Sequence, residues 1–536
     1  MKARVIVLSG RVGAGKSTLA GLLRERIGAK VLKTKDLIAK LSATKLGNRR
    51  TRQLAGQRLD KLTGGRWVVD AVNERILSEA NLELLVVDAA RIPEQVRLIR
   101  QSGWSVVHVH LEASEGSLEE RYKRRPANEE LPSYRDVAMN WTEKHADALK
   151  DLADVVVNTD RCSAGDVFAR VAARIEHRPV LSQPLVDVLI GGQYGSEGKG
   201  NVAHYLAPEY DVLVRVGGPN AGHKVFRTGQ EPYTFRQLPS GALGNKEAKL
   251  VVGAGAVISL KVLLREIAEL SVSYEKLLID PQAMIISEED EQWEIDNLKE
   301  AIGSTAQGIG AATARKIRHR KPDTDVVLAG GVPELKHFIR DTVEYFAECL
   351  SNGKRIMLEG TQGTSLSIHH GHYPHVTSRA TTATACLAEA GLTSRHVRRV
   401  MMVCRTYPIR VGNTATGNTS GFMSGVIDFD EIARRSGLDP SDIKEAEVGS
   451  VSGRPRRVGE FDWAQVRRSA LLNGPTDIAL TFADYLGKEN RKAFRYEQLN
   501  DGTLRFIEEL EKVLGVPVSL ISTNFSDRNI IDRRAW

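Results

Sequence analysis

A glycine-rich turn at residues 191–201 constrains this chain more than any other segment. It reads Gly-Gly-Gln-Tyr-Gly-Ser-Glu-Gly-Lys-Gly-Asn and follows the apolar run 185–190. The apolar run predicts a buried strand, and the turn is expected to connect this strand to a helix. Glycines let main-chain N–H groups approach an anion closely, and Lys199 adds a cation that can follow phosphate charge. The segment therefore predicts a phosphate-binding turn in an α/β domain.

A second glycine turn follows after one further strand. It reads Val-Gly-Gly-Pro-Asn-Ala-Gly-His-Lys over residues 216–224 and contains His223, a side chain that titrates near neutrality. Together the two turns resemble the signature of the adenylosuccinate synthetase family, which carries Gln-Trp-Gly-Asp-Glu-Gly-Lys-Gly and then Asn-Ala-Gly-His. Further segments match that family in order: 238–241, 252–256, 302–310, 359–364, 370–378 with 381–382, 410–412, 453–459 and 481–484. The resemblance implies a C-terminal mixed sheet with helices.

The resemblance also implies a reaction. In that family an NTP transfers its γ-phosphoryl group to O6 of a purine nucleotide, and the amine of L-aspartate then displaces phosphate at C6. Phosphoryl transfer needs charge neutralisation and in-line placement, which Lys199, the loop amides and Mg²⁺ would supply. His223 matches the family's general acid. The catalytic residues implied in this way are Ser196, Lys199, His223 and Gln362.

Binding residues are implied by the same resemblance. The aspartate contacts are Ser452, Arg454 and Arg456, and the two forked guanidinium groups suit bidentate carboxylate recognition. An arginine of the cluster 315–320, such as Arg318, would reach the substrate phosphate of a neighbouring subunit, since the family forms homodimers. Gly222 would also contact Mg²⁺. The implied nucleotide contacts are Gly195, Glu197, Gly198, Gly200, Asn220, Gly222, Thr305, Thr382, Arg410, Asp484 and Ser522.

Ser196 departs from the family pattern. It stands where the family has an aspartate that draws the proton from N1 of the purine. A serine hydroxyl is no base near neutral pH without an activating partner, although its small size leaves room beside C2. The same change resembles the viral branch of the family, which makes the 2-aminoadenine precursor from guanylate or deoxyguanylate. The substrate therefore stays open between IMP and GMP or dGMP, and the alternative is a non-catalytic nucleotide-sensing protein with a degenerate synthetase site.

The phosphate donor also stays open. The family reads guanine with a Thr-Lys-x-Asp segment and a late Gly-Thr-Gly-Pro loop, whereas this chain has Thr-Phe-Ala-Asp at 481–484 and Ser-Thr-Asn-Phe at 522–525. Asp484 could still accept hydrogen bonds from guanine, but Phe482 replaces the lysine. The donor is therefore GTP or ATP. Likewise, Gln307 stands where the family usually carries a basic residue.

A P-loop begins the chain. The apolar run 5–9 predicts a strand that leads into Gly-Arg-Val-Gly-Ala-Gly-Lys-Ser-Thr at 10–18 and then into a helix that ends near Gly28. In such a loop the amides hold the β-phosphate, Lys16 reaches the β and γ oxygens, and Ser17 binds Mg²⁺. The predicted NTP-binding residues are Gly10, Gly13, Gly15, Lys16, Ser17 and Thr18.

A later segment makes the N-terminal region similar to P-loop kinases of the nucleotide kinase group. Residues 88–93 have the pattern Asp-x-x-Arg-x-Pro after the apolar stretch 84–87, which resembles nucleoside and deoxynucleoside monophosphate kinases. A basic helix at 121–125 would cover the phosphates as a lid. The kinase-like residues are Asp36, Asp88, Arg91, Arg121 and Arg125. Alternating strands and helices predict a parallel sheet covered on both faces.

Length and composition agree with two α/β domains. The chain has 536 residues, more than one usual core, and residues 176–184 carry two prolines and little periodicity. We expect a P-loop nucleotide kinase-like domain at 1–180 and an adenylosuccinate synthetase-like domain at 185–536. The net charge of +8 is spread along the chain and aromatic content is 6%, which disfavours nucleic acid as a partner. No long apolar run or secretory leader is evident, and four unpaired-looking cysteines fit the cytoplasm.

Overall fold

The computed structural model describes residues 3–42, 49–79, 82–124, 133–139, 146–160, 162–175, 184–414, 416–447, 456–525 and 529–534. The chain divides into two compact units, residues 1–178 and 179–536. Each unit has its own sheet and its own hydrophobic cores, and each is α/β, which confirms the expected fold class.

The N-terminal unit contains a five-stranded sheet of order β2-β3-β1-β4-β5, in which all neighbouring strands pair in parallel. Its strands are β1 (Arg4–Ser9), β2 (Lys30–Lys33), β3 (Leu84–Asp88), β4 (Ser105–Glu112) and β5 (Val155–Asn158). Its helices are α1 (Lys16–Ile27), α2 (Thr34–Leu41), α3 (Arg49–Thr63), α4 (Arg66–Ser78), α5 (Pro93–Gln101), α6 (Glu115–Lys123), α7 (Tyr134–Ala138), α9 (Ala164–Ile175) and the 3₁₀ helix η1 (Ala146–Leu152).

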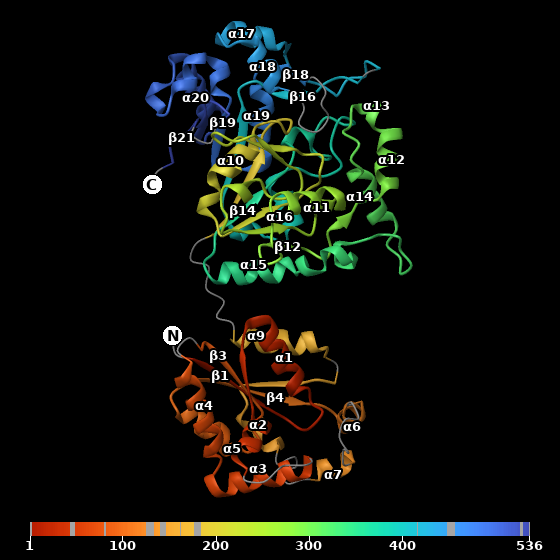
Figure 1. Cartoon of the computed structure of the whole chain (residues 1–536), viewed down its shortest axis with the longest axis vertical. Coiled ribbons are helices and arrows are strands. Elements are labelled where there is room, and N and C mark those ends of the chain that lie inside the picture. Colours follow the sequence, from red (N-terminus) through yellow and green to blue (C-terminus); the bar gives the residue numbers. More distant parts are fainter. Residues whose placement is uncertain are drawn as a thin grey trace. The chain divides into compact units, whose positions relative to one another are not determined.

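Helices cover both faces of this sheet (Figure 1). Because successive strand residues point to opposite faces, Ile6 and Leu8 of β1 pack in one core with α1 and α9, while Val5 and Val7 pack in another with α4 and α5. The predicted first helix is confirmed: α1 begins at Lys16 and is capped by Gly28. The P-loop therefore lies at the carboxyl end of the central strand β1.

The C-terminal unit contains a nine-stranded sheet of order β12-β10-β7-β14-β6-β15-β19-β20-β21. Among the described strand pairs of this sheet, only β20 and β21 run antiparallel, so the sheet is mixed. The strands are β6 (Val186–Gly191), β7 (Val212–Arg215), β10 (Lys249–Val252), β12 (Leu277–Ile279), β14 (Ile356–Glu359), β15 (Val397–Arg405), β19 (Asp477–Thr481), β20 (Val518–Ser522) and β21 (Ile530–Asp532).

Three small sheets accompany the large one. They pair β8 (His223–Val225) with β9 (Tyr233–Phe235), β11 (Val257–Ile258) with β13 (Met284–Ile285), and β18 (Arg456–Gly459) with β16 (Ile409–Val411) and β17 (Val426–Ile427). The helices are α10 (Lys199–Leu206), α11 (Leu260–Glu269), α12 (Glu288–Asn297), α13 (Lys299–Ile302), α14 (Ile309–Arg318), α15 (Thr342–Ser351), α16 (Ala383–Ala390), α17 (Phe429–Ser436), α18 (Pro440–Ala446), α19 (Trp463–Asn473) and α20 (Asp501–Leu514). The 3₁₀ helices are η2 (Ala207–Glu209), η3 (Ser240–Leu243), η4 (Ala329–Gly331), η5 (Pro333–Phe338), η6 (Thr364–Leu366), η7 (Ser394–His396), η8 (Ala483–Leu486), η9 (Lys488–Lys492) and η10 (Tyr496–Gln498).

The large sheet also separates two cores. Val188 and Ile190 of β6 belong to one and Leu189 belongs to the other, as strand alternation requires. The carboxyl ends of β6, β14, β15 and β19 lead into segments that match the synthetase family, and β20 leads into residues 522–525, where the family has a different loop. In an open parallel sheet, loops at these strand ends form the usual ligand site. Among the described helices, none has the length and apolar character needed to cross a membrane.

Candidate active site

A cavity of about 240 Å³ opens at the carboxyl end of β6. Its walls come from loops after β6, β14, β19 and β20 and from strand β8, so the sheet assembles it from segments far apart in the sequence. Most of the predicted C-terminal site residues line this cavity: Gly195, Ser196, Gly198, Lys199, Gly200, Asn220, Gly222, His223, Thr305, Gln362, Arg456, Asp484 and Ser522.

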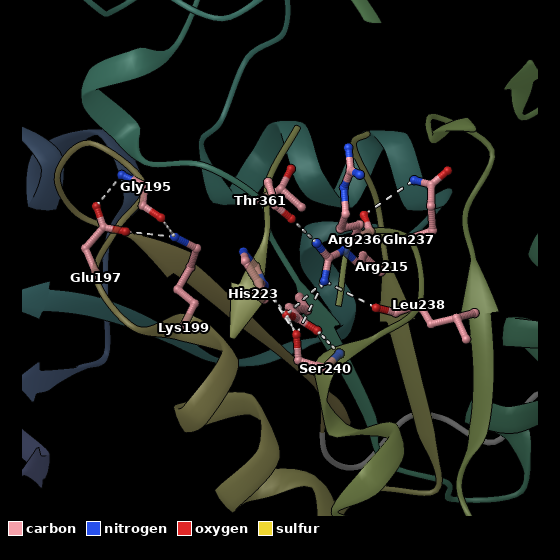
Figure 2. Close-up of polar contacts among 12 residues, drawn as sticks. Gly195, Glu197, Lys199, Arg215, His223, Arg236, Gln237, Leu238, Ser240 and Thr361 are labelled. Carbon is pink, nitrogen blue, oxygen red and sulfur yellow. Dashed lines mark hydrogen bonds and ion pairs between the residues drawn. The ribbon is translucent and has the colours of Figure 1, made fainter. Parts of the chain in front are cut away.

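The first glycine turn is held by a buried ion pair. Oε1 of Glu197 accepts the main-chain N–H groups of Gln193 and Gly195 at 3.0 and 2.7 Å. Its Oε2 lies 2.7 Å from Nζ of Lys199, and both side chains are fully buried (Figure 2). Glu197 therefore fixes the conformation of the loop without lining the cavity, whereas Lys199 lines it.

Glycine at position 200 brings the two glycine turns together. Helix α10 starts directly after Gly198, which adopts a left-handed φ of 82°. A Cβ atom on Gly200 would lie 3.0 Å from the carbonyl oxygen of Lys224 and 3.1 Å from Cβ of His223. The absent side chain lets α10 pack directly on β8, so Lys199 and His223 share one cavity.

His223 is held by a carboxylate at the end of β14. Its Nδ1 is hydrogen-bonded to Glu359, whose other oxygen accepts the main-chain N–H of Ser240 at 2.7 Å (Figure 2). Burial lowers the pKa of His223 to about 4, and the charge of Arg215 acts in the same direction. The ring is therefore neutral near neutral pH, with its proton on Nδ1. Its Nε2 is buried without a hydrogen-bond partner at the cavity wall, so that lone pair faces a ligand.

Ser196 contributes its main chain to a second buried network. Its carbonyl oxygen accepts a hydrogen bond from Arg405 Nη1 at 3.1 Å. No hydrogen bond joins its hydroxyl to any residue that the structure describes, so nothing described activates that hydroxyl as a base. Sequence reasoning did not single out Arg405, which lies more than two hundred residues along the chain.

Glu447 is a functional candidate that sequence reasoning missed. Its fully buried carboxylate accepts hydrogen bonds from Arg405 at 2.7 Å, Arg456 at 3.0 Å and the Tyr485 hydroxyl at 2.9 Å. Burial acts to raise the pKa of Glu447, but the charges of Arg405 and Arg456 lower it by more. The pKa of Glu447 therefore lies below its ordinary value. Glu447 thus anchors Arg456, the described member of the predicted aspartate-binding residues.

Aromatic rings occupy the region where the family reads the donor base. The ring of Phe482 lies 3.8 Å from Cζ of Arg405 and packs edge-on against Phe525, and Phe525 contacts Phe226 at 4.9 Å between ring centroids. Burial raises the pKa of Asp484 to about 6, although Arg491 lies 3.1 Å from this carboxylate and opposes the shift. Asp484 is therefore already paired before any base binds.

Gln362 lines the cavity, and Gln307 lies two residues after Thr305, which also lines it. Gln362 has a left-handed φ of 65°, donates Nε2–H to Thr377 at 2.6 Å and keeps its buried Oε1 without a partner. Gln307, where the family usually has a basic residue, is hydrogen-bonded by the Arg236 guanidinium. Arg236, directly after β9, therefore brings a cation next to Gln307, which in turn donates to the carbonyl oxygen of Thr305.

Some predicted residues lie elsewhere. Thr382 caps helix α16 through the N–H of Ala385, and Arg410 donates to three main-chain carbonyls while covering the Tyr194 ring at 4.6 Å. Glu197, Thr382 and Arg410 are not among the described residues that line the cavity. Ser452 and Arg454 lie outside the described residues.

One arginine of the cluster on α14 forms an ion pair within the C-terminal unit. Arg315 pairs with Asp290 of α12 at 2.6 Å, and this carboxylate is buried. Arg318 is exposed. Of these two arginines, Arg318 is the more accessible.

The N-terminal unit has a larger cavity, of about 960 Å³, beside the P-loop. Nζ of Lys16 folds back onto the carbonyl oxygens of Gly10 and Arg11 at 2.6 and 2.8 Å, so Gly10 contributes a carbonyl rather than lining the cavity. Asp36 is exposed on α2 and is not among the described lining residues, and Arg125 lies outside the described residues. The predicted residues that do line the cavity are Gly13, Gly15, Lys16, Ser17, Thr18, Asp88, Arg91 and Arg121.

Ser17 and Asp88 fit the ligand preference of Mg²⁺. The Ser17 hydroxyl donates to Asp88 Oδ2 at 3.1 Å, which places two oxygen ligands at the end of β3 beside the P-loop. Within the described ranges, no group of three or more His, Cys, Asp or Glu side chains could hold a metal. Mg²⁺ would therefore be held by Ser17 and Asp88 together with phosphate oxygens.

In both units a glycine turn at the end of a parallel strand opens a helix, and a lysine after that turn lines the adjacent cavity. This arrangement defines the class of nucleotide-dependent α/β enzymes. The chain belongs to the adenylosuccinate synthetase family, whose profile matches residues 188–327 and 328–491. Residues 5–156 match a profile described as an AAA domain, which makes the N-terminal unit a P-loop domain. Both resemblances expected from the motifs are thus confirmed.

Individual relatives agree with this assignment. The adenylosuccinate synthetase of Methanocaldococcus jannaschii is 37% identical over 355 residues, which cover 65% of this chain and 96% of the relative. Succinoaminodeoxyadenylate synthetase of cyanophage S-2L, solved with dGMP and with dATP as an energy donor, is 28% identical with a TM-score of 0.55, covering 66% of this chain and 96% of that one. Adenylosuccinate synthetase of Plasmodium falciparum, at 22% identity and a TM-score of 0.57, covers 66% and 100% and shares the fold. The C-terminal unit is therefore an NTP-dependent ligase that couples aspartate to a purine nucleotide.

Replacing Glu359 with glutamine tests how His223 is held. Glutamine cannot supply the negative charge that stabilises a protonated imidazole, so we expect the ligase kcat to fall by roughly a hundredfold with little change in the nucleotide KM. Phosphate release measured across pH should also show the basic limb of kcat moving to lower pH, because the pKa of His223 falls. Ser240→Ala, which keeps the carboxylate, is the matched control. An unmoved limb would contradict this role.

Replacing Glu447 with glutamine tests the anchor of Arg456. The loss of one charge from this buried cluster should raise the KM for aspartate by about tenfold, since hydrogen bonds to charged groups are worth about 1.5–3 kcal/mol. Steady-state kinetics with varied aspartate measure the effect. Tyr485→Phe removes one hydrogen bond to the same carboxylate and keeps the charge, so its aspartate KM should change less. Equal KM values in Glu447→Gln and the unmodified chain would refute the assignment.

Proposed function

We propose that the C-terminal unit joins L-aspartate to C6 of a guanine nucleotide, GMP or dGMP, in preference to IMP. The observation that carries this proposal is Ser196, a small neutral side chain on the cavity wall where the family has an aspartate. The larger carboxylate side chain at that position would crowd a 2-amino group, whereas a serine leaves space. The cyanophage relative, whose structure contains dGMP, supports the same choice.

The reaction follows from the poor leaving ability of the purine oxygen. A γ-phosphoryl group is transferred to O6, the aspartate amine then forms the bond to C6, and phosphate leaves with O6. Lys199 and the amides of the first glycine turn neutralise the phosphoryl charge. Mg²⁺, bound near the Gly222 main chain, would add to that neutralisation. The anionic phosphoryl group raises the pKa of His223, which lets Nε2 carry a proton to the developing oxygen charge.

We further propose an adenine-type donor, ATP or dATP, rather than GTP. Phe482 offers a ring face where the family has a base-reading lysine, and Asp484 is already paired with Arg491. Phe525 and Phe226 extend this aromatic surface, which suits stacking of a base without a guanine-specific contact. The dATP in the cyanophage relative's structure supports this assignment.

Mass spectrometry of reaction products tests substrate and donor together. The full chain is incubated with aspartate, an equal mixture of IMP, GMP and dGMP, and either ATP or GTP. We expect the succinyl group mainly on a guanine nucleotide and mainly with ATP. We also expect Ser196→Asp to lower turnover of guanine nucleotides by roughly tenfold or more, because the larger side chain crowds the 2-amino group. Product from IMP alone would reject the guanine assignment. Tight nucleotide binding without phosphate release would instead favour a nucleotide-sensing protein.

We propose nucleotide kinase activity for the N-terminal unit. The P-loop, the Ser17–Asp88 pair and a cavity with room beyond the phosphate site support transfer of a phosphoryl group to a nucleoside monophosphate. Arg121, hydrogen-bonded to Thr159 at 2.8 Å, stands beside the P-loop in the same cavity. The proposal assigns residues 1–180 to the kinase and 185–536 to the ligase, within a homodimer as the family resemblance implies.

Two lysine variants separate the activities. Lys16→Ala should abolish formation of nucleoside diphosphate, because the P-loop cation is lost, and should leave aspartate ligation within about twofold of the unmodified chain. Lys199→Ala should do the reverse, so each variant is the control for the other. Both products are quantified by chromatography in one reaction. Persistent diphosphate formation in Lys16→Ala would show that the P-loop site is not a kinase site.

A further inference from the structure

The N-terminal cavity extends well past the P-loop. Beyond Lys16 and Ser17 it continues along α2, α3 and α4, where Ile38 and Trp67 give it apolar walls. Lys33, Arg52 and Arg91 also line it. The space thus combines cationic side chains with an apolar part, at Ile38 and Trp67, that suits a flat heterocycle.

A buried carboxylate lies in the apolar part. Asp60 lines the cavity but is only 8% exposed. Its Oδ1 accepts hydrogen bonds from Trp67 Nε1 at 2.7 Å and Gln95 Nε2 at 2.8 Å. Its Oδ2 has no hydrogen bond to any residue that the structure describes. One oxygen is therefore held by the protein, and the other is left without a described partner in a side chain that lines the cavity.

The surroundings favour an N–H donor as the partner of that oxygen. Burial raises the pKa of Asp60, while the hydrogen bonds from Trp67 and Gln95 and the charge of Arg91 oppose the shift. A phosphate would be repelled by this carboxylate and has the P-loop and Lys33 to bind instead. A buried acceptor in a ligand pocket strongly rejects ligands that leave it unpaired.

We propose that Asp60 selects the phosphate acceptor of the N-terminal site, a purine nucleoside monophosphate whose base carries an exocyclic amino group. The amino group donates to Oδ2, the ring lies against the apolar wall that includes Trp67 and Ile38, and the monophosphate faces Lys16. This inference rests on the proposed kinase function and adds the base that it accepts. Guanine nucleotides, the proposed ligase substrates, carry such an amino group.

The test compares GMP, AMP and IMP as acceptors with ATP as donor and no aspartate, using the full chain. GMP and IMP differ only in the 2-amino group. We expect kcat/KM for diphosphate formation to be at least tenfold higher for GMP or AMP than for IMP. In Asp60→Asn the ratio should fall below about threefold, because the amide can still accept from Trp67 and Gln95 but turns N–H groups toward the ligand. Gln95→Met is the matched control, since it removes one donor to Oδ1, leaves Oδ2 in place and lies outside the described cavity lining.

Calorimetric titration of GMP separates this inference from the kinase proposal. The unmodified chain should bind GMP at two sites and Asp60→Asn at one, with the ligase site unchanged. If Asp60→Asn forms diphosphate with the same ratio of kcat/KM for GMP and IMP as the unmodified chain, the inference is overturned and the kinase proposal is retained. A second GMP site lost in Asp60→Asn without any diphosphate formation would reject the kinase and retain the recognition. Two further results would overturn the inference. One is a preference set by the ribose 2′-hydroxyl, measured as different kcat/KM values for GMP and dGMP; the other is a single GMP-binding site in every variant.

Discussion

The buried ion pair between Glu197 and Lys199 is the interaction on which the ligase site depends. Both side chains are withdrawn from water, which is costly unless each charge is fully hydrogen-bonded. Glu197 meets that condition through two main-chain N–H groups of its own turn. The pair therefore fixes the loop and holds Lys199 at the cavity wall before any phosphate binds. His223, packed across Gly200, then has a defined place relative to that lysine.

Short-range patterns were sufficient for much of this molecule. Strand, glycine turn and helix succeed one another within about twenty residues at Lys16 and at Lys199, so the sequence alone predicts both phosphate-binding turns and the α/β class. The parallel N-terminal sheet and the mixed C-terminal sheet both agree with that expectation. Family motifs also brought Asn220, Gln362 and Asp484 to one cavity, although they lie on separate strand ends.

Long-range partners could not be predicted in the same way. Glu447 anchors Arg405 and Arg456 from the end of a short helix, and Glu359 holds His223 from 136 residues away. No local period marks a carboxylate that will meet a distant cation. Conversely, Thr382 has a sequence position typical of the family site, yet its hydroxyl caps α16, because a helix N-terminus needs an acceptor for its open N–H groups. Asp60 was overlooked for a related reason: its burial arises from the packing of α3 on α4 and α5.

The contacts of Arg405 have a thermodynamic consequence. One guanidinium group touches the Ser196 carbonyl, the Glu447 carboxylate and the Phe482 ring, and Glu447 also holds Arg456. A donor base that stacks on Phe482 would then act, through Arg405 and Glu447, on Arg456, the proposed contact for the amino acid. Thermodynamic linkage makes such an effect reciprocal. If the bound triphosphate changes the affinity for the amino acid by some factor, the bound amino acid changes the affinity for the triphosphate by the same factor. The enzyme would thus show heterotropic cooperativity between two co-substrates that never touch.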